Sequence, residues 1–233
     1  MKILVVRRRL FFILLAIICV VIIGFIFLSE PSEEIFKEEV IYKGMKEDKI
    51  VAFLCNVDWG NEYILDMLRI LENCSINITF SITGRWASEN PDLVKEIHKH
   101  NHEIANHGYQ HVDHNKLNYR DNYDAISRTN DILEELIDES PNYFGPPAGA
   151  YNEETVKAAK DLNYTVIMWS VDTIDWRDDT TVELIFNRIT NDINPSDIVL
   201  MHPTENTVKA LPDIIDFLFE NDYKIGTIND ILN

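Results

Sequence analysis

Short apolar segments alternate with amphipathic segments along most of this chain, and this alternation restricts the fold more than any other feature of the sequence. The apolar segments have the length of buried strands, and the segments between them carry apolar residues at helical spacing. Strands are therefore predicted at residues 50–56, 78–82, 103–106, 143–144, 165–171, 198–201 and 223–228, and helices at 63–71, 91–100, 121–137, 153–162, 181–189 and 208–220.

Strands that alternate with helices at this pace build a parallel sheet, and about seven such units predict an α/β fold with a distorted (β/α)7 barrel. The loops that follow the strands of a barrel share one face, where active sites concentrate. A purely structural arrangement would scatter polar residues over both ends of the sheet. Here they follow the strands: Asn56, Asp58, Asn61, Glu62, His107, His111, Asp172, Asp175, Trp176 and His202.

The segment from His102 to His111 holds two histidines, His107 and His111, that are four residues apart. This spacing lets two imidazoles reach one metal ion if the backbone forms a helical turn or a tight loop. The alternative is a polar loop with incidental histidines. The pair follows a predicted strand, where open α/β folds keep their sites, and this favours a metal site.

The amino terminus differs from the rest of the chain. Residues 10–28 contain no charged residue and follow a basic segment, residues 1–9, with Lys2 and Arg7 to Arg9. Nineteen apolar residues at about 1.5 Å each approach the roughly 30 Å of a bilayer core. The sequence thus predicts an uncleaved transmembrane signal-anchor with its basic end in the cytoplasm. A linker, residues 29–48, would then carry a domain, residues 49–233, on the extracytoplasmic side of the cell membrane.

Charge and cysteine content narrow the classes of function. Residues 10–233 carry 17 Lys and Arg against 39 Asp and Glu, a net charge of −22. Such a surface repels phosphate backbones, so no nucleic-acid partner is expected. Cys19 lies in the predicted anchor, whereas Cys55 and Cys74 lie in predicted core elements. A disulfide framework is therefore not expected.

Five motifs occur in the order found in one enzyme family. They are Asp58-Trp59-Gly60, His107 with His111, Gly145-Pro146-Pro147-Ala148-Gly149, the segment Trp169 to Trp176, and Leu200-Met201-His202. With this set, the chain from about residue 45 onward resembles the polysaccharide deacetylase family. This family is also called the NodB homology domain or carbohydrate esterase family 4. The resemblance is strongest to its sporulation-type, membrane-anchored members.

The resemblance implies a divalent metal, most often Zn²⁺ with Co²⁺ or Mn²⁺ as alternatives, that activates water to remove N-acetyl groups. Its ligands would be Asp58, His107 and His111. His202 would protonate the leaving amine, with Asp172 tuning this acid. The substrate would be an N-acetylated cell-wall glycan, such as peptidoglycan or a chitooligosaccharide. The resemblance assigns substrate contacts to Trp176, Leu200, Asp175 and Ala148, the last through its backbone N–H.

Two positions depart from the family pattern. In one alignment Asn56 occupies the position of the general base, and an amide cannot usefully accept a proton. In the other, Asp58 becomes the base and the metal loses its carboxylate, unless Glu62 supplies one. Gly145 stands where the family has the Arg that orients the base. The two losses agree with each other, because an Arg without its carboxylate would be an unpaired charge.

Two hypotheses from different classes follow. One is a metal-dependent N-deacetylase of cell-wall glycan, which rests on the whole motif set. The sequence favours this enzyme, because a protein that only binds has no evident need for His202 with Asp172 in addition to both metal histidines. The other is a degenerate family member that binds glycan or a wall-assembly partner without turnover, as Asn56 and Gly145 suggest. A monomer is expected. The remaining histidines, His98, His100, His102 and His114, are assigned to the surface or to the surroundings of the site.

Overall fold

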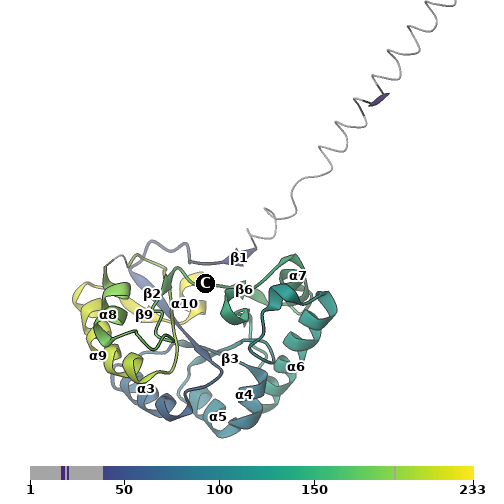
Figure 1. Ribbon diagram of the computed structural model, residues 1–233. Coiled ribbons are helices and arrows are strands. Elements are labelled where there is room, and N and C mark those ends of the chain that lie inside the picture. The colour runs from purple at the N-terminus through teal and green to yellow at the C-terminus, as the bar shows by residue number, and fades with distance from the viewer. Residues whose placement is uncertain (1–16, 19, 21–38, 192) are drawn as a thin grey trace, which may run out of the picture. The chain divides into compact units, whose positions relative to one another are not determined.

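The computed structural model describes residues 17–18, 20, 39–191 and 193–233 (Figure 1). The predicted basic segment and most of the predicted anchor lie outside these residues. Among the residues that are described, no helix is long and apolar enough to cross a bilayer. The folded unit begins at Glu39, within the range of the predicted linker, residues 29–48.

One parallel sheet of nine strands organises the folded unit, which confirms the predicted α/β class. The strand order is β1-β6-β5-β4-β3-β2-β8-β7, and β9 also pairs with β2. The strands are β1 Val40–Ile41, β2 Ile50–Val57, β3 Thr79–Ile82, β4 Glu103–Asn106, β5 Tyr143–Phe144, β6 Thr165–Ile167, β7 Val171–Asp172, β8 Ile198–Met201 and β9 Lys224–Gly226.

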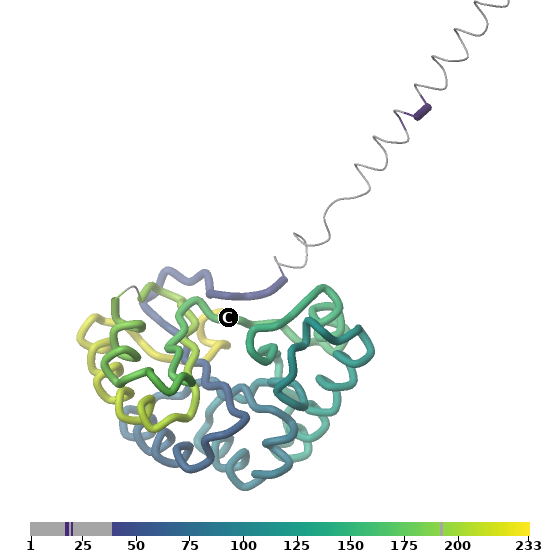
Figure 2. Tube along the Cα trace, in the orientation of Figure 1, coloured from purple at the N-terminus to yellow at the C-terminus, as the bar shows by residue number. Residues whose placement is uncertain are grey.

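Helices follow most of the strands and cover the outside of the sheet (Figures 1 and 2). Six of them, α4, α6, α7, α8, α9 and α10, begin at an Asn or Thr whose side chain accepts a hydrogen bond from the first turn. The helices are α3 Asn61–Asn73, α4 Gly84–Glu89, α5 Pro91–Lys99, α6 Tyr119–Ile137, α7 Glu153–Asp161, α8 Val182–Thr190, α9 Glu205–Glu220 and α10 Ile228–Leu232, with two 3-10 turns, η1 His114–Lys116 and η2 Pro147–Gly149.

The sheet is curled but open, a half-barrel, so the predicted distorted (β/α)7 barrel is confirmed in part. In the strand order of the described residues, β1 and β7 form the two edges and do not pair with each other. The single strand predicted at 165–171 is instead two strands, β6 and β7, that lie at opposite sides of the sheet. The strand predicted at 223–228 ends at Gly226, because Thr227 caps α10 through a reciprocal pair of hydrogen bonds with Asp230.

Both faces of β2 are buried, and its alternating side chains separate two cores. Phe53 and Cys55 point outward into the large core between sheet and helices. Ala52 and Leu54 point inward and pack with Ile228 and other residues of α10 inside the curl. Successive side chains of a strand alternate between faces. Asn56 therefore follows Leu54 on the inner face, above α10, at the carboxyl end of the strand.

Two of the histidines assigned to the surface or to the surroundings of the site are core residues. His102 is buried at the amino end of β4, where its Nδ1 accepts a hydrogen bond from the backbone N–H of Ile78 at 3.1 Å. His114 is fully buried, and its Nδ1 lies 2.7 Å from Asn122 Oδ1. Burial lowers the pKa of both, that of His102 to about 4.

These low pKa values predict that acid destabilises the fold. The pKa of His102 is lower in the folded chain than in the unfolded chain, so the unfolded chain binds more protons between about pH 6.5 and 4. The free energy of unfolding should therefore fall as pH decreases through this window, with about 3 kcal/mol lost by pH 4 through His102 alone. Urea unfolding at several pH values measures this loss.

The matched variant is His102→Asn, since the amide oxygen retains an acceptor for Ile78 N–H but does not titrate in this range. The variant should lose less stability than the wild type between pH 6.5 and 4. If the free energy of unfolding falls equally with pH in the two proteins, the prediction is wrong.

Candidate active site

A cavity of about 490 Å³ opens at the carboxyl ends of the strands, where the sequence predicted the site. It brings together side chains that follow β2, β4, β5, β6, β7 and β8. Its walls are formed by Asn56, Asp58, Trp59, His107, His111, Ala148, Trp169, Asp172, Trp176, Leu200 and His202.

The two predicted metal histidines lie next to each other, with ring centroids 5.4 Å apart. His107 is fully buried, and its Nδ1 lies 2.6 Å from the carbonyl oxygen of Gly145. Nδ1 must donate this hydrogen bond, since a carbonyl only accepts, so Nε2 carries the lone pair of a neutral ring. Burial lowers the pKa of His107 to about 3, which keeps the ring neutral at pH 7.

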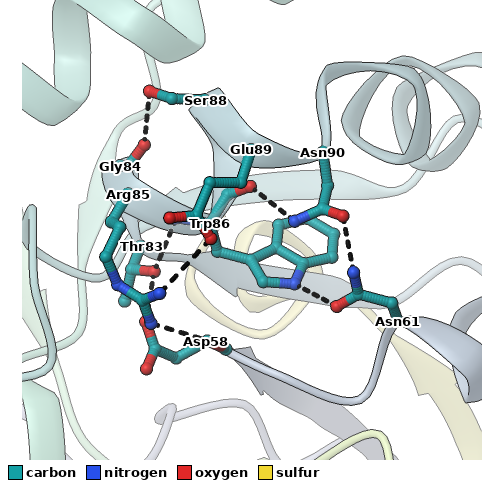
Figure 3. Close-up of polar contacts among 9 residues, drawn as sticks. All are labelled: Asp58, Asn61, Thr83, Gly84, Arg85, Trp86, Ser88, Glu89 and Asn90. Carbon is teal, nitrogen blue, oxygen red and sulfur yellow. Dashed lines mark hydrogen bonds and ion pairs between the residues drawn. The ribbon is translucent and has the colours of Figure 1, made fainter.

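Asp58, the predicted carboxylate ligand, is held by two donors through one oxygen. Its Oδ1 accepts a hydrogen bond from Thr83 Oγ1 at 2.7 Å and one from Arg85 Nη2 at 2.9 Å (Figure 3). Within the part of the chain that is described, no three His, Cys, Asp or Glu side chains are gathered as a metal-binding group. The predicted triad of Asp58, His107 and His111 is therefore not assembled as such.

The donor chemistry nevertheless fits a divalent metal. Nε2 of His107 is a buried nitrogen without a hydrogen-bond partner among the described residues, and such an atom calls for a ligand. His111 adds a second imidazole beside it, and the second oxygen of Asp58 accepts no hydrogen bond from the described chain. Neutral imidazoles and a carboxylate are the ligands that zinc takes.

His202 pairs with Asp175, and the predicted pairing with Asp172 is wrong. Asp175 Oδ1 lies 2.7 Å from His202 Nδ1, and Asp175 Oδ2 accepts hydrogen bonds from the backbone N–H of His202 and from Thr207 Oγ1. The Asp175 side chain is fully buried. This burial does not agree with the substrate contact that was predicted for Asp175. Asp172 lines the cavity, and its Oδ1 accepts the backbone N–H of Ile174 at 2.8 Å.

A strained residue explains why the second aspartate reaches the histidine. Ile174 lies between the two aspartates with φ of 51°, a left-handed conformation that a β-branched residue rarely adopts. Such a residue costs on the order of 1–3 kcal/mol and tends to occur at functional sites. The turn is closed by Thr180 Oγ1, which donates to the carbonyl oxygen of Ile174 at 2.7 Å. It brings Asp175 under His202 and leaves Asp172 at the cavity.

The different roles of the two aspartates lead to a stability prediction. Asp175→Ala should lower the free energy of unfolding by about 3 kcal/mol, because a buried carboxylate loses three hydrogen bonds and leaves their donors unpaired. Asp172→Ala should cost about 1 kcal/mol or less, since Asp172 is only half-buried. Urea denaturation measures both, and equal losses would contradict the assignment.

The position expected for the general base is occupied by an unpaired amide. Asn56 lies at the cavity floor, and its Oδ1 is buried without a hydrogen-bond partner in the described structure. Ser81 Oγ, on the neighbouring strand in register with Asn56, is also buried and has no hydrogen-bond partner among the described residues. Gly145 lies beside them, and a Cβ atom on Gly145 would meet Ser81 Oγ at 3.2 Å. Glu62, the alternative carboxylate, is exposed on α3 and does not line the cavity.

Aromatic side chains form much of the cavity wall. Trp59 stacks on His202 with ring centroids 5.9 Å apart and ring planes 5° from parallel. Trp169 and Trp176 also line the cavity, and Trp176 is 56% exposed. Leu200 and Ala148 also line the cavity, with Ala148 in a left-handed conformation, φ 53°.

The sequence profile of the polysaccharide deacetylase family matches residues 43–167, more than half of the chain. The chain belongs to the polysaccharide deacetylase family. This confirms the family predicted from the five motifs, and the carboxyl-terminal motifs beyond residue 167 lie in the same cavity as those within the match.

Three relatives are similar to this chain over most of its length. The uncharacterized protein YlxY of Bacillus subtilis is 36% identical over 86% of this chain. A peptidoglycan-N-acetylglucosamine deacetylase of Bacillus cereus is 31% identical over 83% of this chain and 92% of its own length. A crystal structure of a CE4 family pseudoenzyme from Bacillus anthracis matches with a TM-score of 0.81 at 38% identity, over 83% of this chain and 69% of that one.

The chain is shorter than some of these relatives. It covers 62% of the length of YlxY and 58% of a second peptidoglycan-N-acetylglucosamine deacetylase of Bacillus cereus.

Three parts of the site were not predicted from the sequence. Trp59 was not expected to stack on His202, and Ser81 was not considered. Thr83 and Arg85 bind Asp58, and they follow the strand at 78–82, whose loop was left out of the predicted site. Their position after a parallel strand is the signal that would have included them.

Proposed function

We propose that this chain is a degenerate polysaccharide deacetylase that binds N-acetylated cell-wall glycan without hydrolysing it at the rate of an intact family enzyme. The observation that carries the proposal is Asn56, an amide at the base position, with its Oδ1 buried and unpaired in the described structure. A general base contributes about 10²- to 10⁴-fold to a rate, so its loss removes most of the catalysis.

Among the described residues, the carboxylates around the cavity already have other contacts. Asp172 lines the cavity, and its Oδ1 accepts the backbone N–H of Ile174. Asp58 Oδ1 already accepts hydrogen bonds from Thr83 and Arg85. Asp175 is buried against His202, and Glu62 is exposed on α3 outside the cavity. Gly145 supplies no side chain to orient a base.

A metal at His107 and His111, with Asp58 as third ligand, belongs to the same proposal. Zinc is the proposed ion, in view of the two imidazoles and one carboxylate. Such an ion, when bound, polarises the carbonyl of an acetamido group and lowers the pKa of a bound water. In a protein without a base, His107, His111 and Asp58 would hold the ion, and Trp176, Trp169 and Leu200 would provide apolar walls for the sugar.

The relatives support this function. The Bacillus anthracis relative is described as a pseudoenzyme, and one of its mutants, 37% identical to this chain, as having restored enzymatic activity. The peptidoglycan deacetylases among the relatives support a cell-wall glycan as the ligand. We further propose that residues 10–28 anchor the chain in the cell membrane with the folded unit on the extracytoplasmic side, where such glycans occur.

Deacetylation itself is the second candidate function, and one observation favours it. The His202–Asp175 pair is intact, with a 2.7 Å contact, and has the form of a general acid held by a carboxylate. The two candidates differ in a single measurable product, acetate.

The experiment measures binding and acetate release on the same samples. The purified chain, loaded with Zn²⁺, is titrated calorimetrically with N-acetylglucosamine oligomers and peptidoglycan fragments, and acetate is assayed after prolonged incubation. We expect binding without acetate, and weaker binding by Trp176→Ala. If the wild type releases acetate and the His202→Ala variant does not, the chain is an active deacetylase. Absence of binding to all these glycans would reject the proposed ligand.

A further inference from the structure

We propose that Arg85 is a positioning residue of the metal site. Together with Thr83 it holds one oxygen of Asp58, and so leaves the other oxygen for a metal bound by His107 and His111. This inference rests on the metal site of the proposed function. It assigns a function to a cation that the family motifs do not include.

The contacts around Asp58 restrict its carboxylate to one orientation. Arg85 Nη2 donates to Asp58 Oδ1 at 2.9 Å, and Thr83 Oγ1 donates to the same oxygen at 2.7 Å. Arg85 Nη2 also lies 3.4 Å from the backbone carbonyl oxygen of Asp58. The other end of the guanidinium contacts Glu89 Oε2 at 3.3 Å, as Figure 3 shows. A guanidinium fixed at both ends holds its partner in a defined place.

The same turn of chain also binds the loop that carries the histidines. The backbone N–H of Gly84 donates to the carbonyl oxygen of Gly108 at 2.9 Å, and that of Arg85 donates to Tyr109 at 2.8 Å. Residues 83–85 are therefore bonded both to Asp58 and to the residues directly after His107. This connection links the loop that carries Asp58 to the loop that carries the histidines through the start of α4.

The ion pair itself adds little to the stability of the fold. The side chain of Arg85 is 38% exposed, and ion pairs at exposed positions contribute little to stability. Hydrogen-bond partners of metal ligands have a larger effect on the site, since their removal typically weakens metal binding by 10- to 100-fold. The structure thus predicts that Arg85 matters more for metal affinity than for folding.

Electrostatics alone predicts the opposite change in metal affinity, so the measurement can distinguish the two effects of Arg85. Removing a positive charge next to a cation site should strengthen binding of the cation. A weakened affinity after loss of Arg85 therefore reports the loss of positioning.

The experiment compares Zn²⁺ affinity in the full chain by competition with a chelating dye, and the visible spectrum of the Co²⁺-loaded protein. Arg85→Met should weaken Zn²⁺ binding about 10-fold or more and alter the Co²⁺ spectrum. Its metal-free melting temperature should stay within a few degrees of that of the wild type. Arg85→Gln serves if the Met variant fails to fold. Arg120→Met is the matched control, because Arg120 is 87% exposed on α6, and its affinity should not change.

Unchanged or tighter Zn²⁺ binding by Arg85→Met would overturn the inference while the metal site stands. His107→Ala separates this result from failure of the site itself, because it should abolish the Co²⁺ spectrum. A wild type that binds no Zn²⁺, or a His107→Ala variant that binds it equally well, would reject the proposed metal site and the function of Arg85 with it.

Discussion

Asn56→Asp is expected to raise acetate release from undetectable to at least about 100-fold above the wild-type limit. The substitution places a carboxylate at the cavity floor, where an amide oxygen is now buried without a partner in the described structure. A base at this position contributes about 10²- to 10⁴-fold, and His202 with Asp175 already supplies the acid. Acetate assays on N-acetylated oligosaccharides and peptidoglycan, with Zn²⁺ present, measure the gain.

Gly145→Arg should increase this gain, since a guanidinium beside the new carboxylate favours its charged form. A Cβ atom at this position would meet Ser81 Oγ at 3.2 Å, a tight contact that requires the hydroxyl group to shift by a few tenths of an ångström. Asn56→Ala is the control and should stay inactive, as should Asn56→Asp combined with His202→Ala. If Asn56→Asp and the double variant with Gly145→Arg both remain silent while binding glycan, the missing base is not what stops turnover.

Gly60→Ala is expected to cost about 3 kcal/mol or more of the free energy of unfolding. Gly60 has φ of 83°, which an L-residue rarely adopts, and a Cβ atom there would lie 2.2 Å from the carbonyl oxygen of Pro203. Both the backbone strain and the overlap with backbone must be relieved by moving the loop after β2 away from the loop after β8. Urea denaturation measures the loss.

Gly145→Ala is the matched control for this prediction, because its φ is not positive and its Cβ contact at 3.2 Å is with a side chain. It should change stability by about 1 kcal/mol or less. A Gly60→Ala variant as stable as this control would show that the two loops separate easily. A change in tryptophan fluorescence should accompany the Gly60→Ala substitution, since the stacking of Trp59 on His202 depends on the contact of these loops.

The parallel sheet and the face of the site were predictable because both follow from local patterns. Strand length and helical spacing identified β2, β3 and β4. Because parallel strands end at the same edge of the sheet, the polar residues that follow these strands could also be placed on one face. The break of the segment 165–171 was not predictable, since Met168 to Ser170 are compatible with a strand. Hydrogen bonds from Met168 N–H to Ile41 and from Ser170 N–H to Ile198 divide this segment between two distant strands.

The spacing of the aspartates in the sequence does not show which of them contacts His202. Asp172 and Asp175 are three residues apart, and both lie in the same motif. Only the left-handed turn at Ile174 determines which carboxylate reaches the imidazole, and a β-branched residue gives no sign of such a turn. The contact between Arg85 and Asp58 was likewise hidden, since it joins residues from two loops through a long side chain.

The short passage between β6 and β7 has a mechanical consequence. Three residues, Met168, Trp169 and Ser170, carry the chain from one side of the open sheet to the other edge strand. The two sides are thus tethered covalently, so the sheet cannot flatten without stretching this tether. Trp169, at its centre, lines the cavity, and the width of the cavity is therefore restricted by bond geometry at its wall. Indole emission from Trp169 should accordingly report strain in the whole sheet.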